Sequence, residues 1–157
     1  MSENVFTVLV AMRPELLDAE ARQIEEELRD LGIDRPLSVR LAHWYRLYGS
    51  LNRQAAERLA RELLSDPIAQ EVALDRDPIP LDRVAWIAEI GLKPGVTDPV
   101  GESVLKGARD LGVQGLERVE TGRRVYFLGE ADQETIARIC NALLVNEVVH
   151  TLRLIPV

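Results

Sequence analysis

The chain has one cysteine, Cys140, among 157 residues, which excludes an intrachain disulfide framework and is typical of a reducing, cytoplasmic setting. It has no run of the ~18 apolar residues that a membrane-spanning helix needs, and the residues after Met1 predict no signal peptide. Basic residues are outnumbered, 19 Lys and Arg against 26 Asp and Glu, for a formal charge of −7. This acidic balance argues against nucleic acid and membrane surfaces as partners.

Candidate catalytic and metal-binding residues are also scarce. The two histidines, His43 and His150, have no cysteine, histidine or carboxylate partner at the spacing of metal ligands. Cys140 falls on the apolar stripe of a predicted helix, which favours a buried side chain over a nucleophile. We therefore predict no catalytic, cofactor-binding or metal-binding residue. An independent enzyme would need one of the histidines to meet Cys140 or a carboxylate in the folded chain.

What the sequence does contain is an internal repeat within a composition, 46% hydrophobic and 29% charged, that is typical of a folded globular protein. A shift of 80 positions aligns two halves without a gap. We predict a first repeat at 1–75, a proline-containing linker at 76–83 and a second repeat at 84–157. The identical positions include Pro14 and Pro94, Asp18 and Asp98, Arg29–Gly32 and Arg109–Gly112, Val39 and Val119, Gly49 and Gly129, Arg58 and Arg138, and Leu63–Leu64 and Leu143–Leu144.

Both halves show the same order of secondary-structure patterns. An alternating strand (6–12 and 86–92) precedes a helix, which Asp98 caps and Pro99 begins in the second half. Gly112 follows this helix, where a left-handed residue is needed. Two short strands come next, and a second helix with Asn52 or Asp132 as its cap precedes a final strand. The first strand is apolar on both faces, so we expect its second face to be covered by the other repeat.

This order, β-α-β-β-α-β, is the ferredoxin-like pattern. We therefore predict an α+β protein of two tandem ferredoxin-like units with antiparallel sheets, related by a pseudo-two-fold axis. The short strands are expected at 37–41 and 44–49 in the first unit. In the second unit they are expected at 116–121 and 124–129, with a tight turn at Gly122 and Arg123. The final strands are expected near 69–74 and 148–155.

Two groups of residues are candidates for a partner interface. Arg123 and Arg124 are expected at a hairpin tip, where they either contact a phosphate or an acidic partner or are simply exposed turn residues. Trp44, Arg46 and Tyr48 share one face of a strand, and these residue types are enriched in binding hot spots. The alternative for this second group is ordinary core packing.

A longer motif runs through the second repeat, with a Lys-Pro-Gly turn, Asp-Pro-x-Gly at a helix start, Leu-Gly at the helix end and Val-x-x-Gly-Arg in the next strand. Its residues are Lys93, Pro94, Gly95, Asp98, Pro99, Gly101, Leu111, Gly112, Val119, Gly122 and Arg123. This string resembles the PurS family, the small subunit of phosphoribosylformylglycinamidine (FGAM) synthase. The first repeat departs from it, with Glu15, Ala19 and Ala21 in place of Gly95, Pro99 and Gly101, as in a diverged duplicate.

The resemblance implies a non-catalytic, PurS-like subunit of FGAM synthase in de novo purine biosynthesis. The implied partners are a PurQ-like glutaminase subunit, which releases ammonia from glutamine, and a PurL-like synthetase subunit, which uses ATP. PurS-like units bridge these partners and support ammonia transfer, so this chain would bind no cofactor itself. The duplication also resembles the N-terminal domain of the large single-chain synthase, and fused repeats would replace a PurS homodimer.

Two matters stay open from the sequence. The chain is either a separate subunit or part of a longer synthase. The same element order also occurs in tandem ACT domains, so the alternative function is a regulatory module that binds an amino acid between its units.

Overall fold

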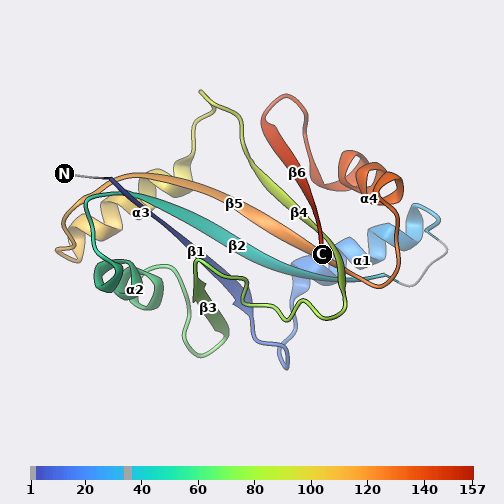
Figure 1. The fold of residues 1–157 in the computed structure, drawn as a ribbon, viewed down its shortest axis with the longest axis horizontal. Coiled ribbons are helices and arrows are strands. Elements are labelled where there is room, and N and C mark those ends of the chain that lie inside the picture. Colours follow the sequence, from blue (N-terminus) through green and yellow to red (C-terminus); the bar gives the residue numbers. More distant parts are fainter. Residues whose placement is uncertain (1–2, 34–36) are drawn as a thin grey trace.

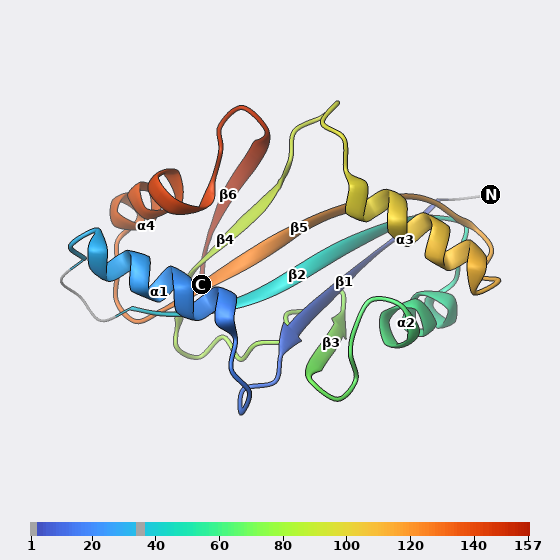
Figure 2. The ribbon, with the colours of Figure 1, turned by 180° about the vertical axis from the view of Figure 1, so that it is seen from behind.

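The computed structural model describes residues 3–33 and 37–157, which form one antiparallel sheet with strand order β3-β1-β2-β5-β4-β6. The helices all lie on one face of this sheet, one pair near each end (Figure 2). The elements are β1 (Asn4–Met12), α1 (Ala19–Asp30), β2 (Ser38–Gly49), α2 (Arg53–Glu62), β3 (Gln70–Leu74), β4 (Val84–Leu92), α3 (Pro99–Asp110), β5 (Leu116–Leu128), α4 (Gln133–Ile139), the π-helical turn η1 (Cys140–Leu144) and β6 (His150–Pro156).

The strand registers preserve the sequence repeat. Val10 faces Val72 where β1 pairs with β3, and Ile90 faces Leu152 where β4 pairs with β6, a displacement of 80 residues in both strands. In the central pair, β2 and β5, His43 faces its own equivalent, Arg123. A pseudo-two-fold axis therefore passes between these two residues. The predicted α+β fold of two tandem ferredoxin-like units is confirmed.

The predicted pairs of short strands are wrong, because each pair is one continuous strand. β2 runs through 38–49 and β5 through 116–128, and the expected turn at Gly122 and Arg123 lies in the middle of β5. A Gly-Arg pair is typical of a turn locally, but here Gly122 is paired with Trp44 of β2 and Gly91 of β4. Hydrogen bonding on both sides holds the backbone of β5 extended, and the partner on one side comes from the other repeat.

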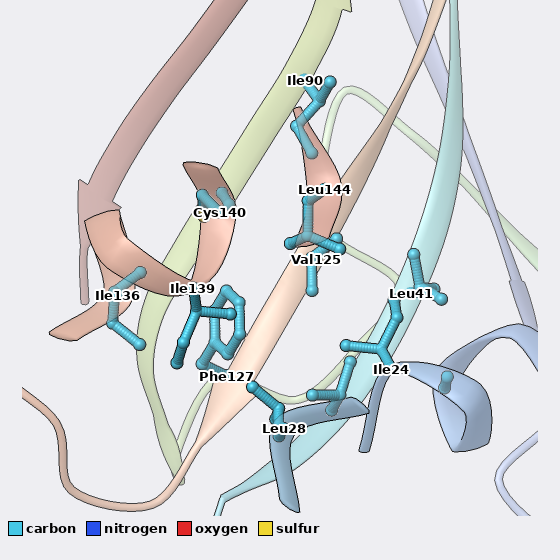
Figure 3. Close-up of a cluster of buried hydrophobic side chains, with 13 residues drawn as sticks. Ile24, Leu28, Leu41, Ile90, Val125, Phe127, Ile136, Ile139, Cys140 and Leu144 are labelled. Atoms are coloured by element: carbon cyan, nitrogen blue, oxygen red, sulfur yellow. The ribbon is translucent and has the colours of Figure 1, made fainter. Parts of the chain in front are cut away.

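Each helical layer combines the two repeats. Helices α1 and α4 cover one end of the sheet in a single apolar cluster, and Figure 3 shows Ile24 and Leu28 of α1 facing the same strands as Ile139 of α4. Helices α2 and α3 share the cluster at the other end. A fully buried Leu, Ile or Phe stabilises the fold by about 1.5–3 kcal/mol relative to an exposed one. Either repeat alone would therefore lose part of both cores.

The opposite face of the sheet, seen in Figure 1, is covered only in part. Leu9 and Ala11 of β1 are buried there, together with Tyr126 of β5 and Ile79 of the linker between β3 and β4. The linker thus supplies part of the cover expected from the other repeat, and Val84, Ile87 and Tyr126 of that repeat belong to the same cluster. Among the described residues, no helix is long and apolar enough to cross a membrane.

The predicted caps are confirmed. Asn52 and Asp132 accept hydrogen bonds from the N–H groups of Ala55 and Thr135 at 2.8 Å. Gly112 follows α3 with a φ of 75°, a conformation that glycine adopts without strain. Helices α1 and α3 begin at equivalent aspartates, but their surroundings differ. Among the described residues, the Asp18 carboxylate accepts a hydrogen bond from the N–H of Ala21 alone, at 3.1 Å.

Asp98 makes a larger set of bonds than its equivalent. It accepts from the N–H of Gly101 at 2.9 Å and from both the N–H and the hydroxyl of Thr121 on β5. These bonds tie the start of α3 to the sheet. Gly101 allows the close approach, since a Cβ there would lie 2.7 Å from the carbonyl oxygen of Val119.

The two aspartates make a matched pair for a stability test. We expect Asp18→Ala to lower the free energy of unfolding by about 1 kcal/mol through loss of a helix cap. Asp98→Ala should cost about 2 kcal/mol, because it also leaves the Thr121 donors without their acceptor. Urea unfolding with unchanged m-values measures both. Equal losses from the two variants would contradict a role for Asp98 beyond capping.

Candidate functional site: the Trp44 hollow

A hollow of about 730 Å³ opens on the face of the sheet opposite the helices, and we name it the Trp44 hollow. It forms where β4 parts from β5, because their pairing ends at Gly91 and Gly122 and the chain then enters the loop at 93–98. The lining residues are Trp44, Arg46, Glu89, Gly91, Leu92, Lys93, Pro94, Gly95, Val96, Asp98, Arg118, Val119, Glu120, Thr121, Thr151, Leu152 and Arg153.

Trp44 lies at the base of the hollow and is only 4% exposed. Its indole ring occupies the space that side chains would take at Gly91 and Gly122, because a Cβ at either position would meet the ring. The guanidinium of Arg46 stacks 4.5 Å from the ring centroid, within the range of a cation–π contact. Within the described part of the chain, the buried Nε1–H of Trp44 has no acceptor.

Glu89 is the centre of a charged network beside the hollow. In the sheet it lies between Arg124 of β5 and Arg153 of β6, and both guanidiniums donate to its carboxylate, at 2.8 and 3.0 Å. Arg46 approaches the same carboxylate at 3.7 Å. Burial raises the pKa of Glu89, but the three guanidiniums outweigh it, so the pKa is lowered overall. The carboxylate therefore stays ionised and fixes three cations at this face.

The network extends to the linker. Arg124 donates to Asp77 at 2.7 Å, and the hydroxyl of Tyr126 donates to the same carboxylate oxygen. Burial, followed by the hydrogen bond to Asp77, raises the pKa of Tyr126, so the phenol stays protonated as a donor. These bonds hold the linker against the sheet beside the pseudo-two-fold axis.

The rim of the hollow carries the predicted Lys-Pro-Gly turn. Gly95 has a φ of 86°, which explains the glycine of the motif. The Lys93 ammonium makes no hydrogen bond or ion pair with the described residues, and Arg118 pairs with Glu120 at 2.9 Å. Four cations, Arg46, Lys93, Arg118 and Arg153, thus face three carboxylates, Glu89, Asp98 and Glu120, in a chain of net charge −7.

The structure divides the predicted interface residues between two faces. Trp44 and Arg46 line the hollow, and Tyr48 lies on the same face under the guanidinium of Arg118, 3.8 Å from its ring centroid. Placing Arg123 and Arg124 at a hairpin tip is wrong, because both lie in the middle of β5. Alternation along the strand sends them to opposite faces.

Their surroundings confirm that neither arginine is an exposed turn residue. The side chain of Arg124 is 16% exposed within the Glu89 network. Arg123 points to the helical face, where it donates to Glu20 of α1 at 3.0 Å and to the carbonyl of Leu144 at 3.1 Å. Arg123 is thus a link between helices of the two repeats.

The predicted turn and cap residues of the second repeat gather around α3. Lys93, Pro94, Gly95 and Asp98 line the hollow, and Gly122 lies under Trp44. Pro99 occupies the first turn of α3, with Gly101 against β5 and Gly112 beyond its far end.

His43 meets a carboxylate, as an enzyme interpretation would require, but without a nucleophile. Its Nε2 lies 3.0 Å from Glu20, and the hydrogen bond from His43 is the main cause of the lowered pKa of Glu20. A carboxylate with a lowered pKa is a weak base. Cys140 is fully buried, and burial raises the pKa of its thiol to about 12. Among the described residues, the histidine rings hydrogen-bond to Glu20 and to the N–H of Asn146. The described residues contain no cluster of three potential metal-ligating side chains.

Sequence reasoning missed Glu89, Arg153 and Glu20. Glu89 carried a signal, since it is the one charged residue within the apolar strand 84–92. Arg153 alternates with Leu152 and Leu154 in the final strand, which placed it opposite the core but gave no partner. Nothing local distinguishes Glu20 from the other acidic residues of its helix.

The fold defines a class of protein: an internally duplicated α+β protein whose two ferredoxin-like units share one sheet and two cores. The model of the PurS family, described as phosphoribosylformylglycinamidine (FGAM) synthase, matches residues 5–77 and again residues 87–155. The chain therefore belongs to the PurS family and contains two tandem copies of the PurS unit.

A curated relative agrees with this assignment. The phosphoribosylformylglycinamidine synthase subunit PurS of Synechocystis sp. is 34% identical over 65 residues, which make up 38% of this chain and 65% of the relative. The aligned segment thus spans just under two thirds of the relative's length.

The Glu89 network leads to a pH-dependent prediction. Glu89→Gln should lower the free energy of unfolding at pH 7 by about 3 kcal/mol, because Arg124 loses one of its two carboxylate partners and Arg46 and Arg153 lose the carboxylate that they share. A carboxylate with a lowered folded pKa stabilises the fold above its unfolded pKa, about 4.3, and the stabilisation is lost as the pH falls through the folded value. The difference between wild type and variant should therefore shrink below about pH 4.

Chemical denaturation across pH 3–7 measures this difference, with Glu130→Gln as the control because Glu130 is exposed. A gap that stays constant over this range would show that Glu89 does not stabilise the fold as an ion-paired carboxylate.

Proposed function

We propose that this chain is a PurS-like, non-catalytic subunit of the FGAM synthase complex in de novo purine biosynthesis, acting in the cytoplasm. The observation that carries the proposal is the double family match, whose two segments coincide with the two structurally equivalent halves. The relative from Synechocystis sp. bears the name of a synthase subunit. In this role the chain bridges a PurQ-like glutaminase and a PurL-like synthetase and supports ammonia transfer between them.

The shared sheet supports the idea that the fused repeats replace a PurS homodimer. Each core needs helices from both repeats, so the unit that folds is the pair. Fusion makes this pairing intramolecular and removes its dependence on protein concentration. It also lets the halves diverge, as Glu20 illustrates, since it pairs with both residues on the axis while its equivalent is Val100.

The burial of Cys140 fits a subunit that leaves chemistry to its partners. A thiol with a pKa near 12 is protonated at neutral pH and is a poor nucleophile. In the proposed complex, glutamine and ATP are used by the glutaminase and synthetase subunits, and this chain binds neither.

Reconstitution tests the proposed function. Glutaminase and synthetase subunits of the same source are assayed for FGAM formation with and without this chain, using glutamine or ammonia as the nitrogen donor. We expect the chain to be required for turnover with glutamine but not with ammonia.

The contrary outcome is equally defined. No effect with either donor, together with no complex on a sizing column, would overturn the proposal. A melting temperature raised by a free amino acid in the same preparation would then favour the ACT-like regulatory module.

A further inference from the structure

On the face of the sheet opposite the helices, which we call the open face, the two repeats differ at equivalent places. The pseudo-two-fold axis relates Trp44 and Arg46 to Arg124 and Tyr126, and it relates Glu89 and Gly91 to Leu9 and Ala11. Both sets combine an arginine and an aromatic residue of a central strand with two residues of the neighbouring strand. One set is covered, whereas the other lines the Trp44 hollow.

The chain's own linker covers the first set. Asp77 accepts hydrogen bonds from Arg124 and Tyr126, and Ile79, two residues later, is buried against the cluster that contains Leu9. The linker thus binds this place through one carboxylate and one apolar side chain. A smaller hollow of about 400 Å³ remains beside it, bordered by Arg76 and Pro78 of the same linker.

The Trp44 hollow offers the matching chemistry without an occupant from the described chain. The Arg46 guanidinium, half-buried over the indole, and the Arg153 guanidinium, 65% exposed, flank one side. Lys93 has no partner among the described residues, and all three carboxylates at the hollow are already hydrogen-bonded or ion-paired. Arg46, Arg118 and Arg153 are ion-paired as well, so the lining holds one cation more than carboxylates. Lys93 is the cation of the lining without an ion pair among the described residues, on a chain that is acidic overall.

We propose that the Trp44 hollow receives an acidic segment from a partner subunit, with a carboxylate between Arg46, Lys93 and Arg153 and an apolar side chain beside Leu92 and Val96 of the lining. The linker at the equivalent place is the template for this contact. The inference rests on the proposed function, because the partner is the glutaminase or the synthetase subunit of the complex.

Charge reversal tests the proposal in the assembled complex. Lys93→Glu and Arg153→Glu should each weaken binding of the chain to its partner subunits about tenfold, and the double variant about a hundredfold. The loss should diminish as salt is raised, because exposed charges are screened. Arg138→Glu on α4 is the matched control, with the same charge change on the helical face, and it should bind like wild type.

Lys93 keeps the test interpretable, since it is exposed and its ammonium makes no hydrogen bond or ion pair within the described residues. Its replacement should therefore leave the melting temperature unchanged. A photo-cross-linking residue at position 93 then identifies what enters the hollow. Cross-links to a partner segment that holds an Asp or Glu with an apolar residue nearby would support the proposal.

The outcomes separate the two levels of inference. If wild type forms no complex with the partner subunits, the proposed function fails and this inference fails with it. In a second outcome, the complex forms while the charge-reversed variants bind as tightly as wild type. In a third, position 93 cross-links only to a segment without acidic residues. Either of these two results would overturn the proposed acidic occupant of the hollow and leave the proposed function standing.

Discussion

The hydrogen-bonded pairing of β2 with β5 is the constraint on which the rest of the structure depends. It joins the repeats into one sheet and fixes the pseudo-two-fold axis between His43 and Arg123. Each central strand extends past the axis. One part of it therefore packs against a helix of its own repeat, and the other part packs against a helix of the other repeat. This places α1 beside α4 and α2 beside α3, so the apolar cores form only when both repeats are present.

Fusion of the repeats allows equivalent positions in the two halves to hold different residues, and so to make different contacts. On the helical face, Glu20 binds both axis residues, although its equivalent is apolar. On the open face, the linker seals one of two equivalent places and leaves the other as the Trp44 hollow. Two exact copies would present the same surface twice. A duplicated and diverged chain presents two different surfaces, which suits a subunit proposed to stand between two different partners.

Glu89 connects the stability of the sheet to the shape of the hollow. A carboxylate placed in the middle of a strand loses solvation, and the arginines on both neighbouring strands offset this cost. The same contacts orient Arg124, which holds the linker through Asp77, and Arg153, which lies at the hollow. Glu89 thus helps to hold the linker over one part of the open face and to orient Arg153 at the Trp44 hollow.

The sequence by itself determined the duplication, the helices with their caps, the ferredoxin-like order and the motif of the second repeat. These features depend on contacts within a few residues, on periodicity or on the comparison of one half with the other. Only the tertiary structure decided that β2 and β5 are continuous, that Arg123 and Arg124 are partly buried, and that Trp44 meets Gly91 and Gly122 beneath a hollow. Those outcomes depend on the register between strands about 80 residues apart, which local sequence does not encode because hydrogen-bond partners across a sheet are chosen only when the whole sheet forms.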